Sequence, residues 1–480
     1  MFCRKDILGE GSKGTCVYKG MFDGSIPVAV KRMVYFITTD WNEVMREVKT
    51  LKKMDHPNVI RYRLFDKDKD FVYIALDLCD NSLIECLNKL GKNPRYSGKS
   101  EEKMRFKISL LRDILKGLGY LHKMGIIHRD LKPQNVLVKK DVTAEFKAVA
   151  VITDFGLSVE IPNGQSHVTA TEGGSKGWIA REMLDNVSRN RDIKGKKKFK
   201  KGMDIFSFGC IAQMVLFSTS DSSNKWAHPF GNEKSRERNI FLGKRVALLT
   251  HPLGAVDYHS LLADLMIGMC VCNNPALRPT TEDLINFPFF WDFAKGLHFL
   301  EKIFNDFKDK FGEESMVKEL ETNWQKYTTE SFAAKIPEAW GYHVFCRKEA
   351  KQGKPSEKSL FNGLLRNMRN IRQHCIEATG RYTVTHKHAG SKEETKLDQV
   401  LGSKSDEDIG RYFLGRIPFL LPVTYLTFFE HARQQSILQE YYKNTGDCVF
   451  CVKSAWSTMD RLTGTGKRSS SRSRSKTRSN

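Results

Sequence analysis

The stretch from Ile126 to Gly156 constrains the fold of this chain more than any other feature. It reads I-I-H-R-D-L-K-P-Q-N-V-L-V and, after a short gap, V-I-T-D-F-G. Two carboxylates, an amine and an amide follow one another in the order and spacing that phosphoryl transfer with magnesium uses. They belong to Asp130, Lys132, Asn135 and Asp154. Apolar runs flank these polar residues and predict short buried strands that hold them at a cleft.

A glycine-rich segment and a lysine precede this stretch at the spacing of a nucleotide site. The segment reads L-G-E-G-S-K-G-T-C-V, and a V-A-V-K sequence follows it and ends at Lys31. Glycine lets backbone amides approach phosphates closely, and the lysine would contact the α- and β-phosphates. The residues expected over the nucleotide are Gly9, Gly11, Gly14 and Val17. Together these motifs indicate the catalytic core of a eukaryotic-type protein kinase that uses ATP and Mg²⁺.

The remaining nucleotide and metal contacts can be named from neighbouring elements. In the helix expected from Trp41 to Met54, Glu43 and Glu47 are both candidates to pair with Lys31, and we prefer Glu47. A strand then enters a hinge whose backbone groups would meet adenine; these belong to Asp77 and Cys79. The expected Mg²⁺ ligands are Asn135 and Asp154.

Three features are expected downstream of the D-F-G sequence. Arginine replaces the usual proline of an A-P-E motif, and we expect Glu182 of this motif to pair with Arg278. Asp204 should hold the backbone of the catalytic loop. A phosphate on the activation segment could order it through Arg129, although any single hydroxyl there is more often an ordinary loop residue. The candidate hydroxyls are those of Ser166, Thr169, Thr171 and Ser175.

The net charge of +22 is unusual, and more than half of it lies in two short runs. Residues 189–201 carry eight Lys or Arg against one Asp, and residues 467–478 carry six with no acid. The first run interrupts the kinase motifs and predicts a surface insertion, whereas the second lies in a low-complexity tail expected to be disordered. Such runs are either solvated or attract polyanions, RNA above all, or an anionic membrane face. Composition leaves that choice open.

The last third of the chain contains a helix, expected from Leu360 to Cys375, with an unusual polar face. Its expected buried stripe consists of Phe361, Leu364, Met368, Ile371 and Cys375. Asn370 and His374, four residues apart, would project together from the other face near Arg369. A histidine beside an arginine and an amide could cleave RNA without a metal. On periodicity alone, an ordinary solvated face is the more common explanation.

Several motifs together resemble the inositol-requiring-enzyme family of kinase/endoribonucleases, to which RNase L is related. They are W-I-A-x-E-M-L after the activation segment, H-P-F-G, F-P-F-F-W, L-L-R-x-M-R-N-x-x-x-H, and F-L-G-R-I-P-F-L-L-P-V-T-Y near the end. The resemblance implies an α+β two-lobed protein-kinase fold followed by an all-α ribonuclease domain. It also implies that His374 is the general acid of the nuclease, while Arg369 and Asn370 bind and orient the phosphate.

The resemblance further implies partners and a pathway. A chain of this family would phosphorylate itself in trans, bind ATP or ADP, form a homodimer or higher oligomer, and cleave stem-loop RNA in a stress response. An upstream sensor region would precede the sequence given. One position departs from the family: Ser356 stands near the place of a nuclease tyrosine. Either Tyr342 takes that role or the nuclease is weakened, and we expect it to be active.

Two alternatives remain open for the second half of the chain. It could be only a dimerisation or scaffold module on an active protein kinase. Alternatively, the kinase cleft could bind nucleotide only to set the dimer, although an intact Asp130 argues against this.

The expected parts are a kinase N-lobe at residues 1–80, a kinase C-lobe at 81–292 with the basic insertion at 189–201, a helical endoribonuclease domain at 293–445 and a basic tail at 446–480. No window reaches the apolar length of a membrane span, and the start lacks a signal-peptide pattern. We therefore expect the chain as given to be soluble and cytoplasmic. As a fragment of a longer membrane protein, it would lie on the cytosolic face of the endoplasmic reticulum.

Overall fold

The computed structural model describes residues 2–11, 14–35, 41–92, 100–140, 148–170, 173–184, 197–217, 227–246, 258–307, 315–327, 365, 368–369, 372, 383–388, 391–396, 405–432, 441–442, 456 and 459–460. The chain divides into two compact units. The first comprises residues 1–250, 266–290 and 442–451, and the second residues 251–265, 291–441 and 452–480.

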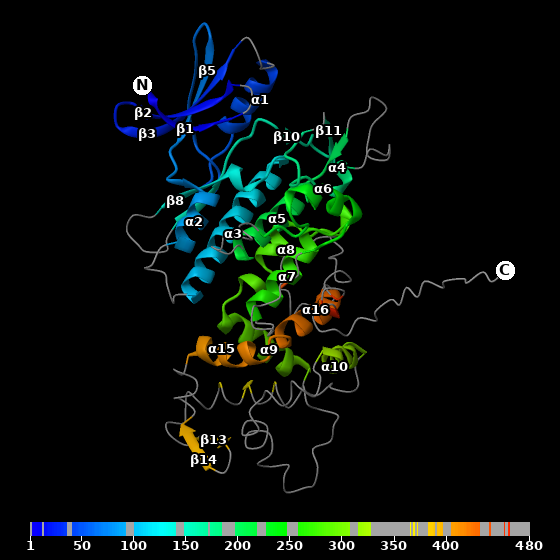
Figure 1. Ribbon diagram of the computed structural model, residues 1–480. Coiled ribbons are helices and arrows are strands. Elements are labelled where there is room, and N and C mark those ends of the chain that lie inside the picture. Colours follow the sequence, from blue (N-terminus) through cyan, green and yellow to red (C-terminus); the bar gives the residue numbers. More distant parts are fainter. Residues whose placement is uncertain are drawn as a thin grey trace, which may run out of the picture. The chain divides into compact units, whose positions relative to one another are not determined.

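A five-stranded antiparallel sheet begins the first unit and appears in blue at the top of Figure 1. In order across the sheet its strands are β1 (Phe2–Glu10), β2 (Cys16–Phe22), β3 (Ile26–Val34), β5 (Phe71–Asp77) and β4 (Tyr62–Lys67). Helix α1 (Trp41–Lys52) lies between strands β3 and β4 in the sequence. It buries Val44, Val48 and Leu51, the apolar face that helical periodicity predicts.

Helices make up most of the remainder of the first unit (Figure 1). They are α2 (Leu83–Lys92), α3 (Ser100–Lys123), α4 (Arg181–Leu184), α5 (Gly202–Phe217), α6 (Glu233–Leu242) and α8 (Thr281–Ile285), with 3₁₀ turns at Pro133–Asn135, Pro275–Leu277 and Pro288–Phe290. Helix α7 (Tyr258–Cys270) contributes residues to both units. The central helix α3 packs on α5, α8 and strand β9 (Ala148–Ile152).

One glycine of α3 brings the strand that leads to the D-F-G sequence close to this helix. A Cβ added at Gly117 would lie 2.5 Å from the carbonyl oxygen of Asn58 and 3.1 Å from the side chain of Ile152. Asn58 in turn accepts a hydrogen bond from the Ile152 backbone N–H at 3.0 Å. Any side chain at Gly117 would therefore push apart the backbone segments that place the D-F-G residues.

Three small sheets hold the catalytic stretch. Strands β6 (Asn81–Ser82), β8 (Val136–Lys140) and β9 form one, β7 (Ile126–Ile127) pairs with β10 (Val159–Glu160), and β11 (Val168–Ala170) pairs with β12 (Lys197–Phe199). The two apolar runs that flank the polar residues are thus β8 and β9, and their central residues are buried. The buried strands predicted on either side of the catalytic residues are confirmed.

The basic run at residues 189–201 differs at its end from the surface insertion that its charge predicts. Lys197–Phe199 form strand β12, which pairs antiparallel with the activation segment, and Phe199 is only 2% exposed. An aromatic ring among lysines buries its apolar area whenever a neighbouring strand offers a surface. This part of the run therefore belongs to the packed kinase unit.

The described part of the second unit is mainly helical. Its helices are α9 (Phe293–Phe307), α10 (Ser315–Tyr327), α15 (Asp406–Arg416) and α16 (Leu420–Ala432). Helix α9 packs against α15 and α16, and α10 against α16. Residues Leu300, Ile303, Phe304 and Phe307 are buried, as the helical spacing predicts. A hairpin of β13 (Thr383–His388) and β14 (Ser391–Lys396) adds strands to a domain expected to contain only helices.

Both halves of the expected fold are thus found: a sheet-bearing lobe and a helical lobe of a kinase, and a helical second unit. The residue boundaries drawn from the sequence remain predictions. Within the described ranges, no single helix has the length and apolar composition to cross a membrane. Helices α15 and α16 meet the criteria only as a pair bent by 93°.

Candidate functional site

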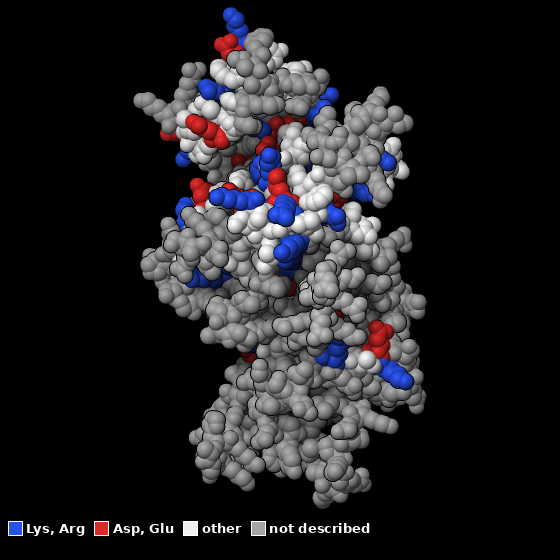
Figure 2. Space-filling view, turned by 45° about the vertical axis from the view of Figure 1, so that its right-hand side comes forward, with Lys and Arg blue, Asp and Glu red and all other residues white. Residues whose placement is uncertain are grey.

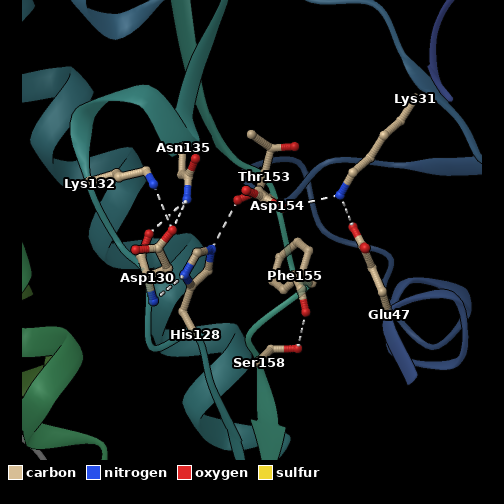
Figure 3. A network of polar contacts seen from close by, with 10 residues as sticks. All are labelled: Lys31, Glu47, His128, Asp130, Lys132, Asn135, Thr153, Asp154, Phe155 and Ser158. Carbon is tan, nitrogen blue, oxygen red and sulfur yellow. Dashed lines mark hydrogen bonds and ion pairs between the residues drawn. The ribbon is translucent and has the colours of Figure 1, made fainter. Parts of the chain in front are cut away.

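Lys31 on β3 forms two ion pairs that join the sheet lobe to the D-F-G sequence (Figure 3). Its Nζ lies 2.7 Å from Oε1 of Glu47 on α1 and 3.2 Å from Oδ1 of Asp154. Glu47 is therefore the partner of Lys31, as preferred from the sequence. Burial alone would lower the pKa of Lys31, but the two carboxylates outweigh it and raise that pKa. The lysine is fully charged at neutral pH.

Asp154 is held in a conformation that few residues adopt. Its φ is 66°, in the left-handed region that non-glycine residues rarely occupy. Burial opposes ionisation of its carboxyl, but Lys31 nearby keeps its pKa below the ordinary value. A strained backbone at a charged cleft residue is typical of a functional position. Asp154 therefore presents an ionised carboxylate to the cleft.

The carboxylate of Asp130 accepts three hydrogen bonds, and Figure 3 shows the two from Lys132 and Asn135. Its Oδ2 accepts hydrogen bonds from Nζ of Lys132 at 2.8 Å and from Nδ2 of Asn135 at 3.1 Å. Its Oδ1 accepts from the backbone N–H of Ser175 at 2.8 Å. Asp130, Lys132 and Asn135 come from one loop and the following 3₁₀ turn, so the local chain geometry alone brings them together. These hydrogen bonds fix the orientation of the carboxylate and therefore the direction from which it can accept a proton.

The donor set of the cleft suits Mg²⁺. Because the amide nitrogen of Asn135 donates to both the backbone and the side chain of Asp130, its amide oxygen is the atom that a metal would contact. This oxygen and the Asp154 carboxylate are hard ligands of the kind Mg²⁺ prefers. Among the described residues, no group of three or more His, Cys, Asp or Glu could hold a metal. A magnesium ion here would therefore need phosphate oxygens as well.

Asp204 holds the backbone of the catalytic loop, as predicted. Its buried carboxylate accepts from the backbone N–H groups of His128 at 2.9 Å and Arg129 at 3.0 Å. It also contacts Nε2 of His122 at 2.9 Å. Burial opposes its ionisation, yet these hydrogen bonds keep its pKa below the ordinary value. The second predicted ion pair is also confirmed, since both carboxylate oxygens of Glu182 accept from Arg278, at 2.6 and 2.8 Å.

The glycine-rich turn lies between β1 and β2, at the end of the cleft. The backbone N–H of Gly11 donates to the carbonyl of Thr15 at 2.8 Å, and Gly14 has a φ of 72°, which a glycine adopts freely. Gly9 is paired with Val17, and Val17 faces Lys31 on β3. Gly9 and Val17 are thus in register with Lys31, and Gly11 and Gly14 lie in the turn that joins their two strands.

The hinge residues lie at the end of β5. The backbone N–H of Asp77 already donates to the carbonyl of Arg61 at 3.0 Å. Its carbonyl and the backbone of Cys79 remain the groups proposed to meet adenine. Burial raises the pKa of the Cys79 thiol to about 11, so this cysteine is neutral at physiological pH.

Ser175 has a structural task that the sequence did not reveal. Its hydroxyl accepts from Nζ of Lys132 at 2.6 Å, and its backbone N–H donates to Asp130. From the sequence it is one of several candidate phosphorylation sites. The spacing of G-G-S-K-G after the D-F-G sequence was the available signal. In this arrangement Ser175 anchors the activation segment to the catalytic loop.

Arg129, the residue expected to bind an activating phosphate, has its guanidinium over an aromatic ring. Its Cζ lies 3.9 Å from the ring centroid of Phe199 on β12. Burial lowers the pKa of its guanidinium to about 10, which still leaves it charged at neutral pH. Three of the four candidate hydroxyls, those of Ser166, Thr169 and Ser175, lie in the described part of the segment, and Thr171 lies outside the described residues.

Charged side chains of both signs gather on the face of the kinase unit shown in Figure 2. Among the residues drawn in colour, blue and red groups are interspersed on this face. A cleft that binds a nucleotide phosphate needs this mixture, because the cation and the carboxylates act on different parts of the ligand.

The second candidate site is described only in part. Leu365, Met368, Arg369 and Arg372 have helical backbone. Leu365 and Met368 are buried, and Met368 belongs to the predicted apolar stripe. The Cζ of Arg369 lies 6.0 Å from the ring centroid of Phe304 on α9. Four residues weighed for this site lie outside the described residues, namely Asn370, His374, Tyr342 and Ser356.

The two lobes, with a lysine paired to a helix glutamate and to the D-F-G aspartate, define a protein kinase fold. The sequence profile of the family described as "Protein kinase domain" matches residues 2–290, more than half of the chain. The chain belongs to the protein kinase family.

Over nearly its whole length the chain is also similar to a narrower group. The "Serine/threonine-protein kinase/endoribonuclease ire-1" of Caenorhabditis elegans is 31% identical over 453 residues, which cover 92% of this chain and 41% of that protein. "Serine/threonine-protein kinase/endoribonuclease IRE2" of Homo sapiens is 30% identical, covering 92% and 42%. "Sensor for unfolded proteins in the ER ire1" of Schizosaccharomyces pombe is 30% identical, covering 87% and 37%.

These matches confirm the resemblance to the inositol-requiring-enzyme family seen in the sequence motifs. They extend well past residue 290, where the kinase profile ends, and so include the second unit. The chain spans less than half the length of these relatives.

Proposed function

We propose that this chain is a bifunctional enzyme, a serine/threonine protein kinase that phosphorylates itself in trans and an endoribonuclease that needs no metal. The observation that carries the kinase half is the pairing of Lys31 with both Glu47 and Asp154 beside the oriented carboxylate of Asp130. The names of the relatives that match 92% of the chain support the nuclease half.

In the kinase reaction, each cleft residue has a separate task. ATP with Mg²⁺ supplies the phosphoryl group when bound. Lys31, fixed by Glu47, would hold the α- and β-phosphates, and Asp154 with Asn135 would hold the metal. Asp130 would accept the proton of the attacking hydroxyl, because Lys132 and Asn135 already orient its Oδ2. Lys132 would then balance charge on the transferred group.

In the nuclease reaction, three residues of one helix would act together. His374 would donate a proton to the leaving 5′ oxygen, while Arg369 and Asn370 would bind and orient the phosphate. The 2′-hydroxyl would attack the phosphorus and lose its proton to solvent water, while the P–O5′ bond breaks and O5′ takes the proton of His374. The products would be a 2′,3′-cyclic phosphate and a 5′-hydroxyl, and because Arg369 and Asn370 would supply the charge stabilisation, no metal is needed.

The same proposal covers partners and place. The names of the relatives include a sensor of unfolded proteins in the endoplasmic reticulum. We infer that ATP or ADP binding and dimerisation activate the nuclease in a comparable stress response. The RNA substrate would be a stem-loop, and the site of action would be the cytosolic face of the endoplasmic reticulum.

The test is cleavage of a labelled RNA hairpin by the full chain in EDTA, with the ribonuclease chemistry separated from the kinase. The unchanged chain should cut the hairpin, and His374→Ala should reduce the rate by about 10²- to 10⁴-fold, as expected on removing a general acid. Autophosphorylation by His374→Ala in Mg²⁺ is the control for folding.

Two other outcomes would change this proposal. An intact hairpin together with autophosphorylation would make the second unit a scaffold on an active kinase. Equal cutting by His374→Ala would remove His374 from the mechanism.

A further inference from the structure

Four titratable side chains join three segments of the second unit at one point. His298 and Glu301 come from α9, and Asp406 begins α15. Arg372 comes from the short segment that also carries Arg369, Asn370 and His374. The kinase cleft uses none of these four side chains, and none of them is among the residues proposed for RNA cleavage.

Arg372 is the centre of this group. Its Nε donates to Oδ1 of Asp406 at 2.8 Å and its Nη2 donates to Oδ2 at 3.0 Å, which makes the pair bidentate. Its Nη1 donates to the carboxylate of Glu301. Oδ2 of Asp406 also lies 2.6 Å from Nε2 of His298. One guanidinium therefore contacts two helices at once.

The contact between Arg372 and Asp406 persists at neutral pH because each group favours the charged form of the other. Hydrogen bonding to Asp406 raises the pKa of Arg372, and hydrogen bonding from Arg372 lowers that of Asp406. The side chains of Arg372 and Glu301 are 27% and 11% exposed, so water screens the group only in part. Two carboxylates neutralise Arg372, so its charge serves the fold of this unit more than attraction of RNA phosphates.

The two helices that Arg372 contacts form a close pair. A Cβ added at Gly410 of α15 would lie 2.3 Å from the carbonyl oxygen of Phe293 on α9, so only glycine allows this approach. The backbone N–H of Ala294 donates to Glu407 at 3.1 Å. Helices in such close contact cannot shift independently, and Arg372 is attached to both of them.

The described residues of this segment are held by two kinds of interaction. Leu365 and Met368 are buried, and Arg369 lies near the ring of Phe304. Three residues further along, Arg372 supplies the ionic contact. General acid catalysis and phosphate orientation tolerate displacements of only a fraction of an ångström. A contact that fixes both the rotation and the axial position of this segment would control the reaction carried by its neighbours.

We propose that Arg372 is a positioning residue of the ribonuclease site. It ties the segment that carries Arg369, Asn370 and His374 to α9 and α15 through Glu301 and Asp406. The inference rests on the proposed nuclease function, and it assigns to Arg372 a role that is neither catalysis nor RNA attraction.

The test compares Arg372→Met, Arg372→Lys and Asp406→Asn in the full chain, with a labelled RNA hairpin as probe. Misplacement should lower kcat by about 10- to 100-fold in Arg372→Met while KM changes by less than about threefold. Arg372→Lys keeps the charge but loses the planar fork, so an intermediate kcat is expected. The double variant Arg372→Met/Asp406→Asn should be no slower than the slower single variant, because both changes remove one interaction.

Lys326→Met is the matched control. It also removes one positive charge and one ion pair in the second unit, the pair with Asp460 at 2.6 Å, without touching the Arg372 group. A loss of general RNA attraction would raise KM in both variants alike. Positioning predicts a fall in kcat for Arg372→Met alone, with autophosphorylation unchanged in every variant.

The outcomes separate the two hypotheses. No cleavage by the unchanged chain would overturn the nuclease and, with it, this role of Arg372. Cleavage by the unchanged chain, with kcat of Arg372→Met within about twofold of it, would overturn the positioning role alone. If Arg372→Met does not fold, Asp406→Asn decides by the same criterion, because it keeps the shape of the side chain.

Discussion

The kinase cleft and the segment around Arg372 organise charge in opposite ways. In the cleft, Lys31, Asp154 and Asp130 have both ion-pair partners and proposed tasks in phosphoryl transfer. In the segment around Arg372, the ionic contacts belong to Arg372, which has no proposed chemical role, and Arg369 lies beside an aromatic ring. One site thus combines support and chemistry in the same residues, whereas the other divides them between neighbours along a helix.

This difference explains why sequence motifs predict the kinase cleft better than they predict the contacts of Arg372. Where the reacting groups also hold one another in place, their spacing is restricted and the sequence reveals them. Where positioning is delegated to other residues, the supporting contacts come from distant parts of the chain, as with Glu301 and Asp406. Substitutions in the two regions should therefore have different consequences.

The largest effect is expected for Asp130→Asn, which would separate the two activities. It should lower autophosphorylation by about 10²- to 10⁴-fold, because the amide cannot accept the proton of the attacking hydroxyl. Incorporation of labelled phosphate from ATP measures this, with thermal melting as the folding control. RNA cleavage in the presence of ADP should survive, since nucleotide binding remains. Loss of RNA cleavage together with autophosphorylation would mean that both activities require Asp130.

A smaller but still large effect is expected for Phe199→Ala, which tests whether support in the kinase unit is also local. Loss of a buried ring should cost about 3–5 kcal/mol of stability. It also frees Arg129, so autophosphorylation should fall by about tenfold through loss of order in the activation segment. Unfolding in urea and labelled ATP measure the two effects. Phe241→Ala, at a ring 43% exposed, is the control, and equal losses in both variants would contradict the special position of Phe199.

A third prediction contrasts a buried histidine of the kinase unit with a paired one of the second unit. Burial, assisted by Arg236, lowers the pKa of His228 to about 2. Since the unfolded chain binds the proton near pH 6.5 and the folded chain does not, stability should fall as pH drops below 6.5, by about 1.4 kcal/mol per unit.

Urea unfolding at pH 7.5, 6.5 and 5.5, followed by tryptophan fluorescence, measures the slope assigned to His228. His228→Asn keeps an acceptor for the Phe230 N–H, which the ring now contacts at 3.2 Å, and should flatten the slope. His298→Asn, the same change beside Asp406, should leave it in place. A slope that persists in His228→Asn would assign it to other groups.

The smallest effect is expected from deletion of residues 467–480, which carry six Lys or Arg. The dependence of RNA affinity on log salt should become shallower by about 0.7 for each residue that contacts a phosphate. The kcat of cleavage should not change. Fluorescence anisotropy with the RNA hairpin at several salt concentrations measures the slope, and an identical slope would make the tail irrelevant to RNA binding.

The sequence predicts much of the kinase cleft because its partners are coded by spacing. Glu47 and Arg278 could be named as the partners of Lys31 and Glu182, since helix geometry and motif order leave few choices. Ser175 and Phe199 could not be assigned their contacts. A serine in a loop and a ring among lysines fit many environments, and only the pairing of β11 with β12 decides between them.

The second unit was harder to predict for a related reason. Helical periodicity finds the buried face of α9, but it is silent about which exposed arginine meets which distant carboxylate. Arg372 and Arg369 look alike in the sequence, and only their contacts in the folded chain distinguish them. The β13–β14 hairpin was missed as well, because its strands are rich in Lys, Glu and Thr and lack an apolar face that alternation could reveal.

The buried carboxylate of Asp204 has a consequence for the interpretation of genetic variants. It is 1% exposed and holds two backbone N–H groups directly before Asp130. A loss-of-function variant at this position would register as an inactive kinase in a phosphorylation assay. Its defect would nevertheless be one of loop architecture, so saturating ATP with Mg²⁺, which binds only the folded cleft, should recover part of the activity, whereas saturation cannot do so for Asp130→Asn.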